Sequence, residues 1–376
     1  MNGMPHSPAD PRDLLLVDPN AAAWACAARN FCADFAAAPP ARRYLLGRNV
    51  YARALAKRFE IAGFIDDYTH ETEYLGHPVI RLASLPNDAL VIATAGGQPL
   101  TAARRLEAQG ITHLDYFAAQ RWSGWPLPEP VFNEGFAAEF AANGERYLWL
   151  HDRLADDESR RILRQLLSFR VTQNLRFLDG FAPREEEQYF EDFLNLAPSG
   201  ECFLDVGGFD AHTSLEFIRR CPDYCAVHVF EPEADNRVRC HERLAGQARV
   251  TVHDCGLADA PGELRFAAAG SGSRIADDGT QAIRVARLDD LVDHGIEAPS
   301  FIKIDIEGAE AAALAGMPRT LVRHRPRLAI SAYHRPGDFW RLAEAVLRLR
   351  PDDALFLRHY TESLYETVLF CLPRNT

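Results

Sequence analysis

The sequence has no cysteine pair in CxxC spacing, no long apolar run and no excess of positive charge. Its eight cysteines are scattered among apolar neighbours, which excludes a zinc or iron–sulfur centre built on cysteine pairs and is typical of reduced, buried thiols. No stretch of about 18 apolar residues occurs, and the first residues carry prolines and aspartates where a secretion signal has a basic start and an apolar centre. We therefore expect a cytoplasmic protein without membrane insertion.

The net charge is −12, from 41 Lys and Arg against 53 Asp and Glu. This balance leaves no broad positive surface for a phosphate backbone, so nucleic acid is not an expected partner. Cys240-His241 and His253-x-Cys255 each offer only two ligands, and we expect no metal. A length of 376 residues with 47% hydrophobic and 25% charged residues favours two folded domains.

The order of strand-like and helix-like segments divides the chain into four parts. These are a tail and an alanine-rich helix over 1–40, a small α/β domain over 41–120, a helical linker over 121–198 and a longer α/β domain over 199–376. In the small domain we expect strands at 43–46, 61–65, 89–93 and 112–117.

The longer domain predicts a mostly parallel sheet. Its candidate strands are Cys202–Val206, Ala226–Phe230, Arg249–His253, Phe301–Ile304, Leu328–Ala332, Ala354–Arg358 and Thr367–Cys371. Several are continuous apolar runs, as expected for strands covered on both faces. The last two leave no room for a crossover helix between them and should pair antiparallel.

Polar residues that end the parallel strands mark the expected ligand site. Asp205 and the pair Gly207-Gly208 end the first strand of the longer domain, where a ligand must approach the backbone; a purely structural tight turn is the alternative. Glu231 follows 26 positions after Asp205, where such folds place the acid that holds a ribose. Its alternative role is that of a carboxylate at a helix N-terminus.

The strand 301–304 ends in Asp305, Glu307 and Glu310, and Asp305 should lie beside Asp205. Clustered carboxylates repel one another unless a cation lies between them, so this edge favours a positively charged ligand. The turn also lacks the third glycine of a dinucleotide fingerprint. A ligand with a ribose, a cationic end and no phosphates fits these features, and S-adenosylmethionine has all three.

The second half of the chain resembles the FkbM family of S-adenosylmethionine-dependent methyltransferases. The resemblance is carried by Leu204–Gly208, Val229–Asn236, Ile302–Glu310 and Tyr333-His334, and it covers about Tyr189 to the C-terminus. Many members have Gly-Ala-Asn where this chain has Gly207-Gly208-Phe209, so a polar contact at Phe209 is in doubt.

The resemblance implies a Rossmann-like class I methyltransferase sheet whose last, antiparallel strand is inserted between its neighbours. It also implies O-methyl transfer, commonly to a sugar or natural-product hydroxyl, so the expected partner is a small-molecule or glycan acceptor. By position, Asp205, Gly207 and Gly208 would line the cofactor turn, Glu231 would hold the ribose and Asp305 the methionine end. Asp254 would contact the adenine, or else is a simple turn acid.

Methyl transfer to a hydroxyl needs precise positioning and is helped by a base that accepts the proton. The candidates for this base are His334, Glu307 and His359. An unperturbed histidine pKa near 6.5 would suit His334, while Glu307 could instead steer substrate hydroxyls or cap a helix. Ser271–Arg274 is a loop that could close over the substrate, or a surface loop.

The small front domain resembles the Rossmann-like domains found in some sugar-modifying enzymes. Its Gly47 stands alone where a nucleotide turn has several glycines, and Asp66-Asp67 ends a strand with acids that could hold a ribose or face solvent. We expect a docking or substrate-recruiting module. The alternatives to a methyltransferase are a nicotinamide-dependent sugar oxidoreductase or epimerase using this domain, and a non-catalytic binding module.

Overall fold

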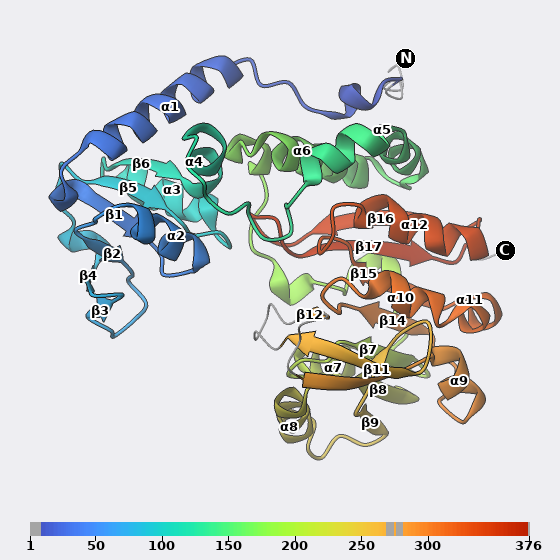
Figure 1. Cartoon of the computed structure of the whole chain (residues 1–376). Helices are drawn as coiled ribbons and strands as arrows, with labels where there is room; N and C mark the ends of the chain where they lie inside the picture. The colour runs from blue at the N-terminus through green and yellow to red at the C-terminus, as the bar shows by residue number, and fades with distance from the viewer. Residues whose placement is uncertain (1–8, 268–273, 276–280, 375–376) are drawn as a thin grey trace. The chain divides into compact units, whose positions relative to one another are not determined.

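The computed structural model describes residues 9–267, 274, 275 and 281–374 of the chain. It divides into two compact units, whose elements are labelled in Figure 1. The first unit comprises residues 1–142, 163–183 and 361–365, and the second comprises 143–162, 184–360 and 366–376. Within residues 121–198, expected to be a helical linker, the two long helices α5 (Phe136–Arg153) and α6 (Asp157–Thr172) each contribute residues to both units.

The first unit contains a six-stranded sheet in the order β3-β4-β2-β1-β5-β6. Its strands are β1 (Arg43–Leu46), β2 (Gly63–Ile65), β3 (Glu73–Tyr74), β4 (His77–Ile80), β5 (Leu90–Ala93) and β6 (Thr112–Asp115). Its helices are α1 (Ala21–Ala37), α2 (Val50–Arg58), α3 (Pro99–Ala108) and α4 (Tyr116–Trp122), with short 3-10 turns at Pro11–Leu14, Pro40–Arg42, Leu82–Ser84 and Leu175–Leu178. All pairs are parallel except β3 with β4.

The predicted strand over 112–117 is wrong at its end. Strand β6 ends at Asp115, whose carboxylate accepts a hydrogen bond from the backbone N–H of Ala118 at 2.9 Å. This cap starts helix α4 at Tyr116, because a side-chain acceptor satisfies an N–H group that has no partner within the helix. Two apolar aromatic residues therefore begin a helix and do not extend a strand.

The second unit is built on a seven-stranded sheet in the order β16-β17-β15-β14-β7-β8-β9 (Figure 1). Its strands are β7 (Cys202–Val206), β8 (Ala226–Phe230), β9 (Val250–His253), β14 (Phe301–Ile304), β15 (Arg327–Ser331), β16 (Ala354–His359) and β17 (Thr367–Leu372). Its helices are α7 (His212–Arg220), α8 (Ala234–Arg243), α9 (Leu288–Asp293), α10 (Glu310–Ala315), α11 (Pro318–His324) and α12 (Asp338–Leu349), with 3-10 turns at Glu185–Glu187 and Asp192–Leu194.

The class I methyltransferase arrangement expected from the sequence is confirmed. Strand β17 lies between β15 and β16 and pairs antiparallel with both, whereas β7, β8, β9, β14 and β15 are mutually parallel neighbours. Because β17 runs in the opposite direction, its first residues lie at the same sheet edge as the last residues of the parallel strands.

Every residue of the central strands β7, β8 and β14 is buried, which explains their continuous apolar sequences. Phe203 on β7 stacks between two rings, at 4.5 Å from Phe217 on α7 and 5.0 Å from Phe301 on β14. This packed aromatic layer makes the centre of the sheet rigid, so the turns that follow these strands have a firm base.

A smaller sheet in the order β10-β13-β11-β12 was not anticipated from the sequence. It consists of β10 (Gly256–Leu257), β11 (Gly262–Ala267), β12 (Arg274–Ile275) and β13 (Gln281–Ala286). Strands β11 and β13 form an antiparallel pair over five residues. The predicted substrate loop falls largely on residues 271–273, which lie outside the described residues.

Candidate active site

A pocket of about 350 Å³ opens at the sheet edge where β7, β8 and β14 end. Its lining includes the glycine turn after β7, Glu231 after β8, Asp305 and Glu307 after β14, and an apolar wall of Leu257, Ile283 and Val285 from the small sheet. The structure therefore brings Gly207, Gly208, Glu231, Asp305 and Glu307 to one pocket, as their positions in the sequence predicted.

The turn after β7 has no room for side chains at its two glycines. At Gly207, whose φ is +88°, an added Cβ would lie 1.8 Å from the backbone oxygen of Asp305. At Gly208 it would lie 2.2 Å from Cγ1 of Val229. Both glycines are therefore required for close packing inside the protein, Gly207 against the backbone after β14 and Gly208 against a side chain of β8.

Asp205 supports this turn from below and does not line the pocket. Its fully buried carboxylate accepts a hydrogen bond from Ser214 Oγ at 2.7 Å and lies 3.1 Å from Lys303 Nζ. Lys303 Nζ also donates to the backbone oxygen of Gly207 at 2.6 Å. Burial alone would lower the pKa of Lys303, but Asp205 and Asp305 outweigh it and raise that pKa, so this buried lysine stays charged.

Glu231 presents a carboxylate that the backbone holds in place. Its Oε2 accepts from the N–H of Phe209 and its Oε1 from the N–H of Glu233, both at 2.8 Å. Burial raises the pKa of Glu231, and these two hydrogen bonds partly offset the rise. Each oxygen retains a lone pair for a ligand hydroxyl, so the group fits a vicinal diol.

Asp305 is the anionic group on the β14 side of the pocket. Its Oδ2 accepts from the hydroxyl of Tyr189 at 2.8 Å. Burial would raise the pKa of Asp305, but the nearby cations Lys303 and His334 outweigh it and lower that pKa. A partly buried carboxylate that remains ionised suits a ligand ammonium or sulfonium.

Glu307 lies two residues further, in a strained turn. Its φ is +55°, a left-handed conformation that costs a residue with a side chain of order 1–3 kcal/mol. Burial raises the pKa of Glu307 to about 7, with His334 limiting the rise. A carboxyl with this pKa changes protonation state near neutral pH, which is what a general base requires.

His334 lies behind these carboxylates and is almost completely buried. Its Nδ1 is 2.9 Å from Glu310 Oε1, and its Nε2 is 3.5 Å from Asp305 Oδ1 and 3.6 Å from Glu307 Oε2. Burial would lower the pKa of His334, but the three carboxylates raise it to about 10. The histidine is therefore an imidazolium at neutral pH, and the pKa near 6.5 expected from the sequence does not apply to it.

Asp305, Glu310 and His334 place one ligand atom each within 4.8 Å of one another, a spacing at which a metal ion could be held. Glu310 Oε1, however, also accepts hydrogen bonds from the N–H groups of Ile306 and Gly308. A cation there would also need His334 to be neutral. The imidazolium itself balances the carboxylates in this structure.

Glu366, which none of the sequence motifs indicates, lines the pocket from the segment just before β17. Its carboxylate accepts from the Nε2 of Gln188, and from the hydroxyl of Tyr333 at 3.3 Å. Burial raises the pKa of Glu366 to about 7, and its φ is +59°. The antiparallel direction of β17 was the available signal, because it brings the start of that strand to the ligand edge.

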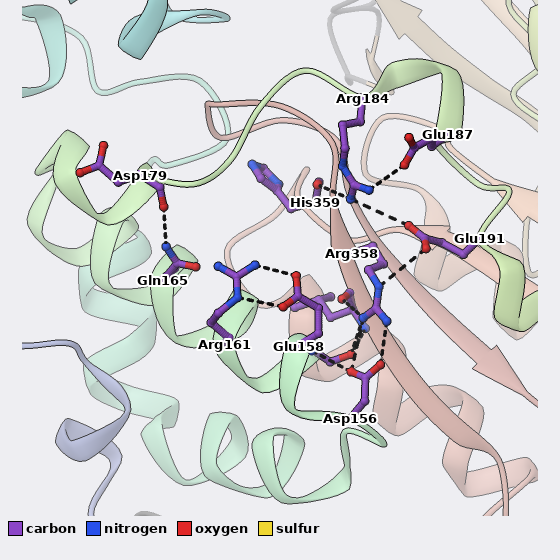
Figure 2. A network of polar contacts seen from close by, with 12 residues as sticks. Asp156, Glu158, Arg161, Gln165, Asp179, Arg184, Glu187, Glu191, Arg358 and His359 are labelled. Carbon is purple, nitrogen blue, oxygen red and sulfur yellow. Dashed lines mark hydrogen bonds and ion pairs between the residues drawn. The ribbon is translucent and has the colours of Figure 1, made fainter.

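Asp254 and His359, like Asp205 and His334, do not line the pocket. Asp254 is exposed and forms an ion pair with Arg284 on β13 at 2.9 Å, the behaviour of a turn acid. His359 is buried on β16, where its Nδ1 lies 2.9 Å from Thr367 Oγ1. Figure 2 shows His359 beside a polar network in which Arg358 contacts Asp156 at 2.6 Å and Glu191 at 3.9 Å.

In the first unit the acids after β2 are engaged by arginines. Asp66 pairs with Arg48 at 2.8 Å and Asp67 pairs with Arg105. The carboxylate of Glu362 accepts hydrogen bonds from the N–H and the hydroxyl of Thr101, in the first turn of α3. A carboxylate of the chain therefore caps the N-terminus of α3, whereas the N-terminus of α2, which follows the Gly47 turn, is capped by the side chain of Asn49.

A model of the methyltransferase FkbM domain matches residues 199–362. The hexuronic acid methyltransferase AglP of Haloferax volcanii is 28% identical over 146 residues, which are 37% of this chain and 59% of that protein. The 2-O-methyltransferase NoeI of Sinorhizobium fredii is 25% identical over 191 residues, 44% of this chain and 78% of that protein.

A crystal structure of the methyltransferase FkbM from Methylobacillus flagellatus resembles the chain over most of its length. It superposes with a TM-score of 0.72 at 25% identity and covers 96% of this chain and 100% of that one. Among the described residues, no helix is long and apolar enough to cross a membrane. The family model and the fold agree with the motifs seen in the sequence: residues 199–362 of this chain match the methyltransferase FkbM domain.

Proposed function

We propose that the second unit binds S-adenosylmethionine and transfers its methyl group to a hydroxyl of a carbohydrate acceptor. The observation that carries this proposal is that three carboxyl groups with different pKa shifts, those of Glu231, Asp305 and Glu307, lie around one pocket. The name of one relative, a hexuronic acid methyltransferase, supports a sugar acceptor, and the name of the other, a 2-O-methyltransferase, supports transfer to oxygen.

The residues of the pocket fit the parts of S-adenosylmethionine. Gly207 and Gly208 line the pocket, so a ligand could approach their backbone closely. Glu231 would hold the ribose diol, and the ionised Asp305 would hold the ammonium of the methionine end. The apolar wall from the small sheet would cover the adenine, in place of the Asp254 contact.

S-adenosylmethionine, when bound, supplies an electrophilic methyl group. Glu307 then accepts the proton of the acceptor hydroxyl on a carboxylate oxygen as that hydroxyl oxygen becomes methylated. The Tyr189 and Tyr333 hydroxyls remain protonated, because burial raises their pKa values well above 10, and they hold Asp305 and Glu366 in place as donors. The buried His334 imidazolium fixes Glu307 from behind and limits its basicity.

Calorimetric titration with S-adenosylmethionine, S-adenosylhomocysteine, NADH and NADPH tests the cofactor. Saturable binding of the two sulfur compounds alone is the expected result. Stoichiometric binding of a nicotinamide cofactor would favour the oxidoreductase alternative, against which the single glycine of the turn Gly47-Arg48-Asn49 argues. Cofactor binding without transfer to any hydroxylated sugar would support the non-catalytic binding module.

A further inference from the structure

A second pocket, of about 540 Å³, adjoins the proposed cofactor pocket. The two share five lining residues, which are Gln188, Tyr189, His212, Thr213 and Glu366. The second pocket is completed by Glu185, Glu186, Phe190 and Glu216. Because it adjoins the pocket on the Glu366 side, it is the space available to an acceptor when the first pocket holds S-adenosylmethionine.

Acidic groups dominate the walls of this acceptor space. Glu185 and Glu186 come from the 3-10 turn before Tyr189, and Glu366 stands at the boundary with the first pocket. The carboxylate of Glu216 is neutralised by Arg219 and Arg220 at 2.6 Å. The remaining glutamates therefore set the charge that an acceptor meets.

Basic groups are scarce in the same walls. Among the described residues that line the two pockets, the basic side chains are Lys303 and His212. Lys303 is already committed to Asp205 and to the backbone of Gly207. A site for an anionic sugar ordinarily uses an arginine fork or a lysine on the carboxylate, and the lining offers neither.

Glu366 lines both pockets, so its carboxylate is the group best placed to interact electrostatically with a charged acceptor. It is held in a fixed orientation by Gln188 and Tyr333, and it is electrostatically coupled to Glu307, whose proton affinity it increases. A further carboxylate brought in by an acceptor would add a negative charge to a desolvated space that already contains these two acids. An ammonium or a neutral hydroxyl would instead be favoured there.

We propose that the acceptor is a neutral or amine-bearing sugar and not a uronate, and that Glu366 is the residue that makes this selection. The inference rests on the proposed function and narrows its acceptor. It separates this chain from its relative named for hexuronic acid, with which it shares 28% identity over 146 residues.

The test supplies methyl-labelled S-adenosylmethionine and three pools of oligosaccharides, one neutral, one amine-bearing and one containing uronates. We expect label in the neutral or amine-bearing pool at about tenfold or more above the uronate pool, the scale of a like-charge penalty. Label in the uronate pool at an equal or higher level overturns the proposal. If calorimetry shows that S-adenosylmethionine binds but no pool is labelled, the proposed acceptor class is wrong. If S-adenosylmethionine does not bind, the proposed function itself is wrong.

The variant Glu366→Gln tests the selecting residue. The glutamine oxygen can still accept from Gln188 Nε2, and its NH2 group can donate to the hydroxyl oxygen of Tyr333, so the fold is expected to persist, and a melting curve checks this. We expect the ratio of neutral to uronate transfer to fall about tenfold, while Glu242→Gln, an exposed site outside both pockets, leaves it unchanged. Glu186→Gln, on the acceptor pocket, should lower the ratio less. An unchanged ratio in a folded Glu366→Gln protein would contradict the assignment.

Discussion

The Nδ1 atom of His334 lies 2.9 Å from Oε1 of Glu310, and both side chains are buried. Asp305 and Glu307 lie on the opposite side of the same ring, so one imidazolium is shared by three carboxylates. Removing the cation would leave these acids facing one another at low dielectric, which couples the stability of the unit to the chemistry of its pocket.

Because of His334, we expect the free energy of unfolding to fall at alkaline pH. Its pKa is raised from 6.5 to about 10 in the folded protein, so its contribution is fully present below pH 6.5 and is lost as pH rises toward 10. Urea unfolding between pH 7.5 and 9.5 should show the free energy of unfolding decreasing. In His334→Gln this decrease should be smaller, and at pH 7 the variant should be about 3–5 kcal/mol less stable than wild type. Equal pH slopes in the two proteins would show that His334 is not charged when folded.

We expect the protonation state of Glu307 to determine how the rate of methyl transfer depends on pH. Because burial raises its pKa to about 7, kcat/KM should increase with pH through about 7 and then level off. Glu307→Gln should lower kcat by about 100-fold or more while leaving calorimetric affinity for S-adenosylmethionine nearly unchanged. His334→Gln should move the acidic limb of the profile to higher pH, since His334 lowers the pKa of Glu307. A profile without a limb near pH 7 would assign the proton to another group.

The central strands could be predicted to the residue because they are buried on both faces. These strands are Cys202–Val206, Ala226–Phe230 and Phe301–Ile304, and none of them alternates between apolar and polar residues. A carboxylate that lines the pocket, or that supports the turn below it, lies at or next to the end of each strand. The small sheet was missed because β11 and β13 are half-exposed, with charged residues such as Glu263 and Arg284 facing each other. Its contribution to the pocket, Leu257, Ile283 and Val285, was missed with it.

The charge state of the site could not be read from the sequence. Motif order placed Asp205, Glu231 and Asp305 at one edge, but only packing shows that Asp205 lies beneath the turn and that His334 is surrounded by acids. Glu366 comes from a segment 61 positions after Asp305 in the numbering, and no motif links the two. A pKa depends on such three-dimensional neighbours, which sequence spacing does not supply.

Substitution of Gly207 is predicted to lower stability. In Gly207→Ala the new methyl would overlap the Asp305 backbone oxygen, and φ of +88° is unfavourable for alanine. We expect a destabilisation of about 3 kcal/mol or more in urea unfolding. Gly262→Ala is the matched control, because a Cβ there meets nothing within 4 Å, and it should change stability little. A fully stable Gly207→Ala protein would show that the turn and β14 are not in close contact.

Substitutions of Asp205 and Glu231, which the sequence assigned to one site, are expected to affect different properties. Changes at Glu231 should mainly lower cofactor affinity, and changes at Asp205 should mainly lower stability. Glu231→Gln keeps the side-chain volume, removes a negative charge at the pocket and replaces one of the two oxygens that accept from backbone N–H groups by an NH2 group. Affinity for S-adenosylmethionine should therefore fall by about tenfold or more, with a smaller loss of stability than in Asp205→Ala. Asp205→Ala leaves Lys303 buried without its carboxylate, 3.1 Å away in the wild type, and should cost about 3–5 kcal/mol of stability. Lys303→Met combined with Asp205→Ala removes both charges and should recover part of that loss, because the unpaired charge is the source of the penalty. Denaturation curves and calorimetry on the three variants separate the two roles: a stable Asp205→Ala protein with lost cofactor affinity would return Asp205 to direct contact with the ligand.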